Sequence, residues 1–340
     1  MLFANRNGPT VNLGLQGGGA HGAFTWGVLD YLLEDGRLRF DGVSGTSAGA
    51  MNAIVLAQGL MEDGRHGARA ALRNFWNAVG AILPLGMITQ GGNGQAMELT
   101  PAMKALLQWT QYFSPEQLNP IDINPLRDIL SEQVDFARLR AHSPVKLFVA
   151  ATHARSGKLR VFRESEVQID AILASACLPT LHRPVEIDGE PYWDGGYAAN
   201  PAVFPLVREC SARDVLIVLL APREYKDMPR TADEIRSRLR ELAFNSAFLR
   251  EMHLLAALRQ WVGGGFHCGR LERRLGKTRF HIIEPHEDMA SLTPDTKLAA
   301  SRPLYSMLCD LGRAQARAWM ARHYERLGKR SSADLGDLFH

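Results

Sequence analysis

Residues 45–49 read Gly-Thr-Ser-Ala-Gly, a G-x-S-x-G pattern between a short apolar run and a stretch of small residues. A serine at the centre of this pattern stands on a sharp turn from strand to helix, and the flanking glycines allow that turn without clashes of β-carbons. The pattern therefore predicts a strand at residues 40–44 and a helix at residues 48–60, which favours an α/β fold. Ser47 is the candidate nucleophile.

A glycine-rich turn at residues 17–22 precedes that serine, between an apolar strand at residues 11–15 and a helix at residues 23–33. A serine hydroxyl is a poor nucleophile, and its reaction with a carbonyl needs fixed N–H donors for the oxyanion that forms. Consecutive glycines can direct bare backbone N–H groups at such a charge. We therefore expect Gly17, Gly18 and Gly19, together with Ala48, to form an oxyanion hole.

The same turn also fits G-x-G-x-x-G, with glycines at positions 17, 19 and 22. That dinucleotide-binding fingerprint needs an acidic residue at the end of the next strand to hold a ribose. Here the next strand ends in Gly45-Thr46-Ser47, and no Gly-Lys-Ser/Thr of a P-loop follows the turn. Nucleotide binding is therefore disfavoured.

A third feature, Asp194-Gly195-Gly196, follows Tyr192-Trp193 at the end of a short predicted strand. An Asp-Gly turn by itself is common. A glycine loop, a serine turn and Asp-Gly-Gly in this order are much less expected by coincidence. With these three features the chain resembles the patatin-like phospholipases, from about residue 11 to the last predicted helix.

The resemblance implies a fold, an activity and a set of site residues. The implied fold is α/β, a three-layer α/β/α patatin-like arrangement with a mostly parallel central sheet and a helical insertion. The implied activity is lipid acyl hydrolysis by a dyad of Ser47 and Asp194, with no metal and no other cofactor. Glycines at the three motifs support the turns: Gly22, Gly45, Gly49, Gly195 and Gly196.

The pattern of elements predicts one hydrolase domain over residues 11–327, followed by a mobile tail at 328–340. A helical insertion is expected at about 61–143 and a C-terminal helical part at about 231–327. Four aromatic residues of the insertion are interpreted either as core or as a lid or acyl-chain groove: Trp76, Trp109, Tyr112 and Phe113. The long helix from 231 to about 262 has a capping box at Thr231 and Glu234. Its apolar stripe consists of Ile235, Leu239, Leu242, Leu249, Met252 and Ala256.

One histidine departs from the family pattern, and others suggest an alternative to the Ser-Asp dyad. His21 stands in the glycine loop where the family often carries Arg or Lys, and a histidine is charged only part of the time near neutral pH. Oxyanion stabilisation should therefore come mainly from backbone N–H groups. A Ser-His-Asp triad would place its histidine downstream of the serine, as are His267, His281 and His286. None of these lies in a recognisable motif, and His182 is expected to be structural.

Composition and motifs limit which partners and which cellular compartment we expect for this protein. A net charge of +3 is too small to indicate nucleic acid as a partner, and there is no H-E-x-x-H or Cys-His cluster for a metal. The four cysteines, Cys177, Cys210, Cys268 and Cys309, form no C-x-x-C pair and suit buried thiols in a reducing compartment. No secretory signal and no membrane-length apolar run is visible. We expect a cytoplasmic protein, with peripheral contact to a membrane left open.

Three function classes follow from these features. The first is a serine lipid acyl hydrolase of the phospholipase A or lysophospholipase type, with a phospholipid or related lipid as substrate. The second is an acyltransferase or thioesterase that uses the same acyl-enzyme, and the third is a non-catalytic lipid-binding protein. Arginines at 313, 317, 322 and 326 of the last helix form either a solvated face or a surface for anionic lipid. The oligomeric state is not indicated by the sequence.

Overall fold

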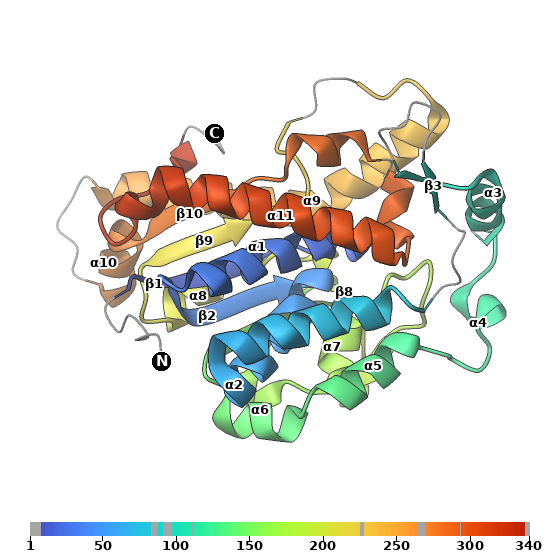
Figure 1. Cartoon of the computed structure of the whole chain (residues 1–340), viewed down its shortest axis with the longest axis horizontal. Coiled ribbons are helices and arrows are strands. Elements are labelled where there is room, and N and C mark those ends of the chain that lie inside the picture. Colours follow the sequence, from blue (N-terminus) through green and yellow to red (C-terminus); the bar gives the residue numbers. More distant parts are fainter. Residues whose placement is uncertain are drawn as a thin grey trace.

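One eight-stranded sheet forms the centre of the protein (Figure 1). The structure is a computed structural model that describes residues 8–82, 88–90, 97–110, 112–224, 228–263, 269–292 and 294–336. The strand order is β10-β9-β1-β2-β5-β8-β7, with β6 paired to β5. Five strands are parallel: β1 (Thr10–Leu15), β2 (Arg39–Thr46), β5 (Lys146–His153), β9 (Asp214–Val218) and β10 (Arg279–Ile283). Three strands at the β5 side are antiparallel: β6 (Leu159–Arg163), β7 (Val185–Ile187) and β8 (Glu190–Asp194).

Helices bury both faces of this sheet. Alternate residues of β9 enter two separate apolar clusters, Leu216 and Val218 in one and Val215 and Ile217 in the other. This pattern is typical of a mostly parallel sheet, which is covered by helices on both sides. The first cluster includes side chains of α1 (Gly22–Asp35), α2 (Ala48–Val79), α7 (Ile169–Ser175) and α11 (Arg302–His323). The second includes side chains of α8 (Phe204–Glu209), α9 (Ala232–Gly263) and α10 (Arg270–Lys277). The expected α/β/α layering is confirmed.

Helix α2 continues past the point where the sequence predicts its end. Its backbone breaks at Asp63 and Gly64, and Gly64 has a left-handed φ of 54°. The helix then resumes, and Phe75 and Trp76 are buried in the main core. The indole N–H of Trp76 donates to Asn52 Oδ1 at 2.9 Å, which ties the two halves of α2 together. Trp76 is therefore core, and the predicted insertion starting at residue 61 includes a core helix.

In the described residues, the remainder of the predicted insertion contains four helices and one short pair of strands. Its helices are α3 (Pro101–Thr110), α4 (Pro115–Leu118), α5 (Pro125–Gln133) and α6 (Phe136–His142). The antiparallel strands β3 (Ile88–Gln90) and β4 (Met97–Leu99) were not expected from the sequence. Trp109 and Tyr112 have exposed fractions of 57% and 85%, so neither belongs to the core.

The C-terminal region differs from expectation at two places. Helix α9 has the predicted capping box, because Glu234 accepts from the Thr231 N–H and its own N–H bonds Thr231 Oγ1. Only part of its predicted apolar stripe is buried, however, and Ile235 and Leu239 are among the side chains that face outward.

The sequence predicts a mobile tail from residue 328, but residues 328–336 are held against the rest of the protein. The N–H groups of Ser332 and Ala333 both donate to the Phe280 carbonyl of β10, and Leu335 is 1% exposed in the second apolar cluster. Residues 337–340 lie outside the described residues.

Helices α1 and α11 run side by side across one face of the sheet (Figure 1), and two glycines set their close approach. A β-carbon added to Gly312 would lie 2.1 Å from the Phe24 carbonyl oxygen, and one added to Gly27 would lie 2.0 Å from the Cys309 carbonyl oxygen. Next to this crossing, Arg313 pairs with Asp30 and Glu34 of α1. Part of the arginine series of the last helix therefore binds α1 rather than forming a free basic face.

Gly312→Ala is expected to lower the free energy of unfolding by about 1–3 kcal/mol, because the added methyl group forces the two helix backbones apart. Gly276→Ala in α10 is the matched control, since its added β-carbon would meet Val262 Cγ1 at an ordinary 3.4 Å. That control should be neutral or raise stability by up to about 1 kcal/mol. Urea denaturation of both variants makes the comparison, and equal effects would contradict close packing of α1 on α11.

Candidate active site

The pairing of strand β5 brings the two central site candidates together. Thr46 at the end of β2 pairs with Ala150, and Asp194 at the end of β8 pairs with the next residue, Ala151. Strand β6 occupies one edge of β5 along residues 148–152, so β2 and β8 must share the other edge. Consecutive Cα atoms of a strand lie about 3.8 Å apart. Ser47, which follows Thr46, is therefore placed beside Asp194.

Ser47 occupies the strained turn that the sequence predicts. Its φ of 54° and ψ of −124° are unusual for a residue with a side chain, and it immediately precedes α2. A β-carbon on Gly49 would lie 2.1 Å from the Leu15 carbonyl oxygen, so only glycine fits behind the turn. The Ser47 N–H donates to the buried Ser175 Oγ at 2.9 Å, and the Ser47 residue is half-buried. The turn is thus held by its backbone while its side chain stays partly accessible.

Asp194 is buried, with an exposed fraction of 1%. Its backbone is fixed on both sides, because its N–H donates to the Cys177 carbonyl and its own carbonyl accepts from Thr152 Oγ1, each at 2.8 Å. Oδ1 accepts from the Gly196 N–H at 2.8 Å. Oδ2 has no hydrogen-bond partner of ordinary geometry. One carboxylate oxygen is therefore held in place, while the other is left without a donor.

The burial of this carboxyl changes its proton affinity. Removal from water raises the pKa of Asp194 to about 7, and the Gly196 N–H and the Ser47 side chain act in the opposite direction. The Ser47 hydroxyl is thus close enough to influence the carboxylate, although no hydrogen bond of ordinary geometry joins it to Oδ2. Contacts of this kind are often long in a site without substrate. The pair has the composition of a nucleophile and its base.

The glycine loop lies directly against Ser47. A β-carbon on Gly17 would be 2.9 Å from Ser47 Cβ, and the Gly17 N–H donates to Asn200 Oδ1 at 2.7 Å. That N–H, which the sequence predicts as an oxyanion donor, is therefore committed to Asn200. Gly18, Gly19 and Ala48 remain as candidate donors, the last at the first position of α2, where N–H groups have no partner within the helix.

Asn200 is a site residue that the sequence did not identify. The Asn200-Pro201 dipeptide signals a turn. Nothing in it reveals a partner 183 residues earlier in the chain. Two side chains of β2 hold the segment around Asn200. Thr46 Oγ1 donates to the Ala199 carbonyl, and Ser44 Oγ donates to the Ala202 carbonyl. The segment after Asp-Gly-Gly is thus fixed to the strand that carries Ser47.

His21 is not a cation in this loop. Its side chain is buried, and Nε2 lies 2.8 Å from Thr296 Oγ1. Burial, with the charge of Lys297 as a second cause, lowers the pKa of His21 to about 3. A β-carbon on Gly19 would lie 2.2 Å from the Lys297 carbonyl oxygen, so the segment around Lys297 covers the loop closely. The neutral His21 positions this cover rather than offering positive charge to a substrate.

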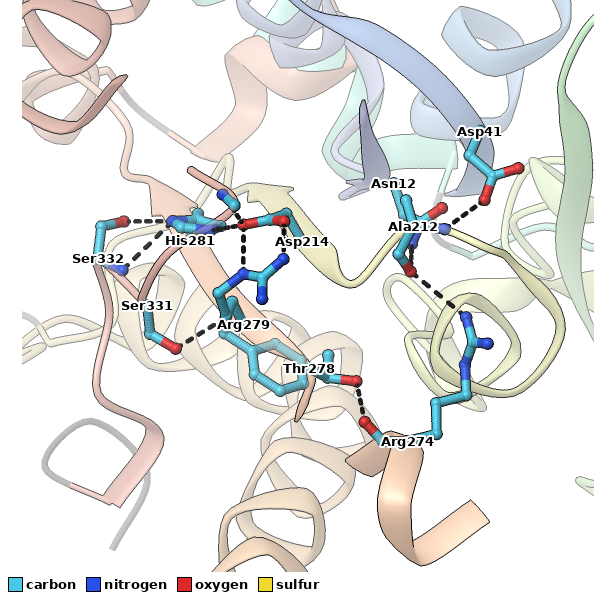
Figure 2. A network of polar contacts seen from close by, with 12 residues as sticks. Asn12, Asp41, Ala212, Asp214, Arg274, Thr278, Arg279, His281, Ser331 and Ser332 are labelled. Carbon is cyan, nitrogen blue, oxygen red and sulfur yellow. Dashed lines mark hydrogen bonds and ion pairs between the residues drawn. The ribbon is translucent and has the colours of Figure 1, made fainter. Parts of the chain in front are cut away.

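His281, one candidate for the rival triad, is not brought to Ser47. His281 is fully buried between Asp214 Oδ1 and Ser332 Oγ, at 2.9 Å from each (Figure 2). Although burial raises the pKa of Asp214, hydrogen bonds from His281 and Arg279 hold it well below its usual range. Asp214 begins β9 and pairs with Val11, whereas Ser47 follows the far end of the parallel β2. His281 therefore serves the opposite end of the sheet.

Two further histidines that the sequence singles out make contacts elsewhere in the described part of the chain. His286 lies 3.3 Å from Asp288 in its own turn. His182 lines a cavity of about 230 Å³ together with Asp122 and Cys177, and burial lowers its pKa. His267 lies outside the described residues.

Three of the four cysteines are free, buried thiols, as expected. They are Cys177, Cys210 and Cys309, and burial raises the pKa of each to about 12. Cys177 donates from Sγ to the Arg183 carbonyl at 2.9 Å and is not a thiolate nucleophile. Cys268 lies outside the described residues. In the described part of the chain, no group of three or more His, Cys, Asp or Glu side chains has a metal-binding arrangement.

Comparison with known proteins identifies the family of this chain. The sequence profile described as Patatin-like phospholipase matches residues 13–207, more than half of the chain. The chain belongs to the patatin-like phospholipase family. The match includes the glycine loop, the turn at Ser47 and the Asp-Gly-Gly segment. Membership supports activity as a lipid hydrolase.

Two solved structures resemble the chain at low identity. VipD from Legionella pneumophila is 18% identical, with 92% of this chain and 67% of VipD covered and a TM-score of 0.45. A chain of the heterodimeric ExoU-SpcU complex from the type III secretion system of Pseudomonas aeruginosa is 14% identical, with 94% and 52% covered and a TM-score of 0.34. No curated protein matches the chain. No helix within the described ranges is long and apolar enough to cross a bilayer.

Asp194→Asn is expected to raise the free energy of unfolding relative to wild type, and more so at about pH 8 than at about pH 5. The native pKa of about 7 lies above the usual pKa of an exposed aspartate. The wild-type protein therefore loses stability as the pH rises from the usual pKa to the native one. Asparagine does not titrate and avoids this loss. Urea denaturation at both pH values measures the difference, and an effect independent of pH would contradict a buried ionising carboxyl.

Proposed function

We propose that the chain is a serine acyl hydrolase that cleaves acyl esters of phospholipids or lysophospholipids. The observation that carries this proposal is the half-buried Ser47 on a strained turn beside the buried Asp194, whose Oδ2 has no hydrogen-bond partner of ordinary geometry. Family membership supports a lipid as the substrate class. The phospholipase A or lysophospholipase type is part of the proposal.

In the acylation step, Ser47 Oγ attacks the ester carbonyl carbon while Asp194 accepts the hydroxyl proton. The carbonyl oxygen becomes an oxyanion, for which Gly18, Gly19 and Ala48 supply N–H groups. The intermediate collapses, the bond to the leaving alcohol breaks, and that alcohol takes the proton from Asp194. The products of this step are an acyl-enzyme and a lysolipid or glycerophospho-alcohol.

In the deacylation step, water attacks the acyl carbonyl carbon and gives a proton to Asp194. The same N–H groups stabilise the second oxyanion. Collapse breaks the bond to Ser47 Oγ, which regains the proton, and releases a fatty acid. No step needs a metal or another cofactor.

The energetics of this scheme depend on two features. Asp194 is a stronger base than an exposed aspartate because burial raises its pKa to about 7, near the working range of a general base. The positive end of α2 lies at Ser47 and adds to the field of the N–H groups. Each oxyanion donor is typically worth roughly 10²–10³ in rate.

Ser47→Ala and Asp194→Asn are each expected to remove ester hydrolysis by a factor of at least about 10³, because each deletes one member of the proposed dyad. A panel of lipid esters assayed for released fatty acid measures this effect and identifies the substrate. Ser332→Ala is the matched control, since Ser332 is the serine that contacts His281 and should leave turnover unchanged. Activity that survives in Ser47→Ala but disappears in Ser332→Ala would overturn the assignment.

The products of one labelled phospholipid separate hydrolysis from acyl transfer. Hydrolysis places the label in free fatty acid, whereas transfer places it in a second ester when an acceptor alcohol is present. Labelled fatty acid as the main product supports the proposal. A labelled ester as the main product would assign the same acyl-enzyme to a transferase.

The pH dependence should report the ionisation of Asp194. The carboxylate accepts a proton only when ionised, so kcat/KM should rise with pH, reach half its plateau near pH 7 and then level off. Initial rates on a soluble short-chain ester across the pH range give the profile. A plateau already reached at about pH 5 would contradict a buried aspartate as the base.

A further inference from the structure

Helix α9 lies against the candidate active site along its inner face. The Phe244 ring packs on Gly196, where an added β-carbon would meet it at 2.1 Å. It also contacts the Tyr197 ring, with centroids 4.5 Å apart and the ring planes tilted by 49°. Asn245 accepts from Gln16, the residue before the glycine loop, at 3.0 Å. Glu241 pairs with Lys297 at 2.6 Å. The first half of α9 is thus fixed to both the Asp-Gly-Gly segment and the cover of the glycine loop.

The outer face of α9 over residues 235–249 carries large apolar side chains. Ile235, Leu239, Leu242 and Leu249 have exposed fractions of 44%, 59%, 45% and 39%. Their spacings of four, three and seven residues place them on one stripe of a helix. Phe248 and Leu255, on the opposite side, are 2% exposed. The sequence predicts an apolar stripe here, and the core lies against the other side of α9.

Positive charge borders this apolar stripe. Arg236, Arg240 and Arg250 are exposed on α9 within the same stretch. Two carboxylates of the stretch point inward, since Glu241 binds Lys297 and Glu251 accepts the N–H groups of Val203 and Phe204. Glu234 is exposed but caps the first turn. An apolar stripe with arginines along one side matches a surface that offers both acyl chains and anionic headgroups.

A second set of exposed apolar side chains lies at the same end of the molecule. The strands β2 and β9 point their carboxyl ends toward the side on which α3 lies (Figure 1). Leu106 and Trp109 of α3 have exposed fractions of 49% and 57%. The catalytic end of the sheet thus has exposed apolar side chains on two separate elements.

We propose that the outer face of α9, defined by Ile235, Leu239, Leu242 and Leu249 with the bordering arginines, docks on a bilayer that contains anionic phospholipid. This inference rests on the proposed function and deepens it by naming the form in which the substrate is met, a lipid surface rather than dispersed monomers. A second copy of the chain is a poorer occupant, because two such faces would bring arginines against arginines. Docking through α9 sets the Ser47 end of the sheet next to the membrane.

The structure favours α9 over the last helix as the membrane-binding surface. Of the arginines that the sequence offered, Arg313 is paired with Asp30 and Glu34, and the Arg317 guanidinium lies over the Tyr31 ring at 5.5 Å from its centroid. Both side chains contact α1. The arginines of α9 instead lie along one side of an exposed apolar stripe, and the described residues of α11 include no exposed large apolar side chain.

Sedimentation with lipid vesicles tests the proposal on the full chain. Wild type should bind vesicles of equimolar phosphatidylcholine and phosphatidylglycerol more strongly than vesicles of phosphatidylcholine alone. Leu239→Glu with Leu242→Glu should weaken binding to both kinds by roughly tenfold or more per leucine. Replacing Arg236, Arg240 and Arg250 by Gln should lower binding to the anionic vesicles by about fivefold per arginine.

Matched controls separate docking from general surface effects. Leu159→Glu changes an equally exposed leucine on β6, and Arg322→Gln with Arg326→Gln changes arginines of the last helix region; both should leave vesicle binding unchanged. All variants should keep the wild-type thermal unfolding profile. The α9 variants should also keep wild-type turnover of a soluble short-chain ester, because they leave the catalytic groups intact.

The outcomes distinguish this inference from the proposed function. Vesicle binding lost only in the α9 variants supports docking, even if no lipid ester is hydrolysed and the proposed function fails. Hydrolysis of a soluble ester without vesicle binding overturns docking and leaves the proposed function standing. Equal binding by wild type and α9 variants also overturns it. So does a change from dimer to monomer in the leucine variant with vesicle binding unchanged, which would assign the face to a second copy.

Discussion

The candidate site depends on one edge of strand β5, where β2 ends and β8 takes over the pairing. Thr46 and Asp194 face consecutive residues of that edge, so residues 148 positions apart in the chain are adjacent through backbone hydrogen bonds of the sheet. The register of the β2–β5 and β5–β8 ladders places the Ser47 turn against the carboxyl of Asp194 without any direct contact between side chains being needed. A shift of one residue in either ladder would turn the relevant side chain to the other face of the sheet. The rigid sheet therefore carries the geometry, while the segments around it are free to vary.

Several local costs are concentrated at this edge. Ser47 takes a backbone conformation that side chains disfavour, and Asp194 is buried with one oxygen lacking a donor. Costs of this kind persist only where the surrounding structure determines them fully. Here the backbone of the two residues is fixed by hydrogen bonds: Ser47 bonds to Ser175, and Asp194 bonds to Thr152 and to the Cys177 carbonyl. The strain and the buried carboxyl fit a catalytic role better than a structural one, because neither adds stability.

The sequence was sufficient where local chemistry decides the structure. Glycines and small residues around positions 17 and 47 define strand–turn–helix units whose form depends on near neighbours, and these units were predicted. It was insufficient where the partner is distant, as for the capture of the Gly17 N–H by Asn200. Periodicity also gives an apolar face without saying what covers it. For this reason the sequence predicts the stripe containing Leu239 but not that it faces outward. Residues 328–336, predicted as part of a mobile tail, are held against β10 through the N–H groups of Ser332 and Ala333.

A crystal structure of the protein after reaction with an alkyl fluorophosphonate tests the account most directly, because the phosphonyl group imitates the tetrahedral intermediate. We predict phosphorus bonded to Ser47 Oγ, a phosphonyl oxygen within hydrogen-bond distance of at least two of the Gly18, Gly19 and Ala48 N–H groups, and the Asp194 carboxylate beside the bonded oxygen. An adduct on Ser332, or a phosphonyl oxygen turned away from the glycine loop, would contradict it.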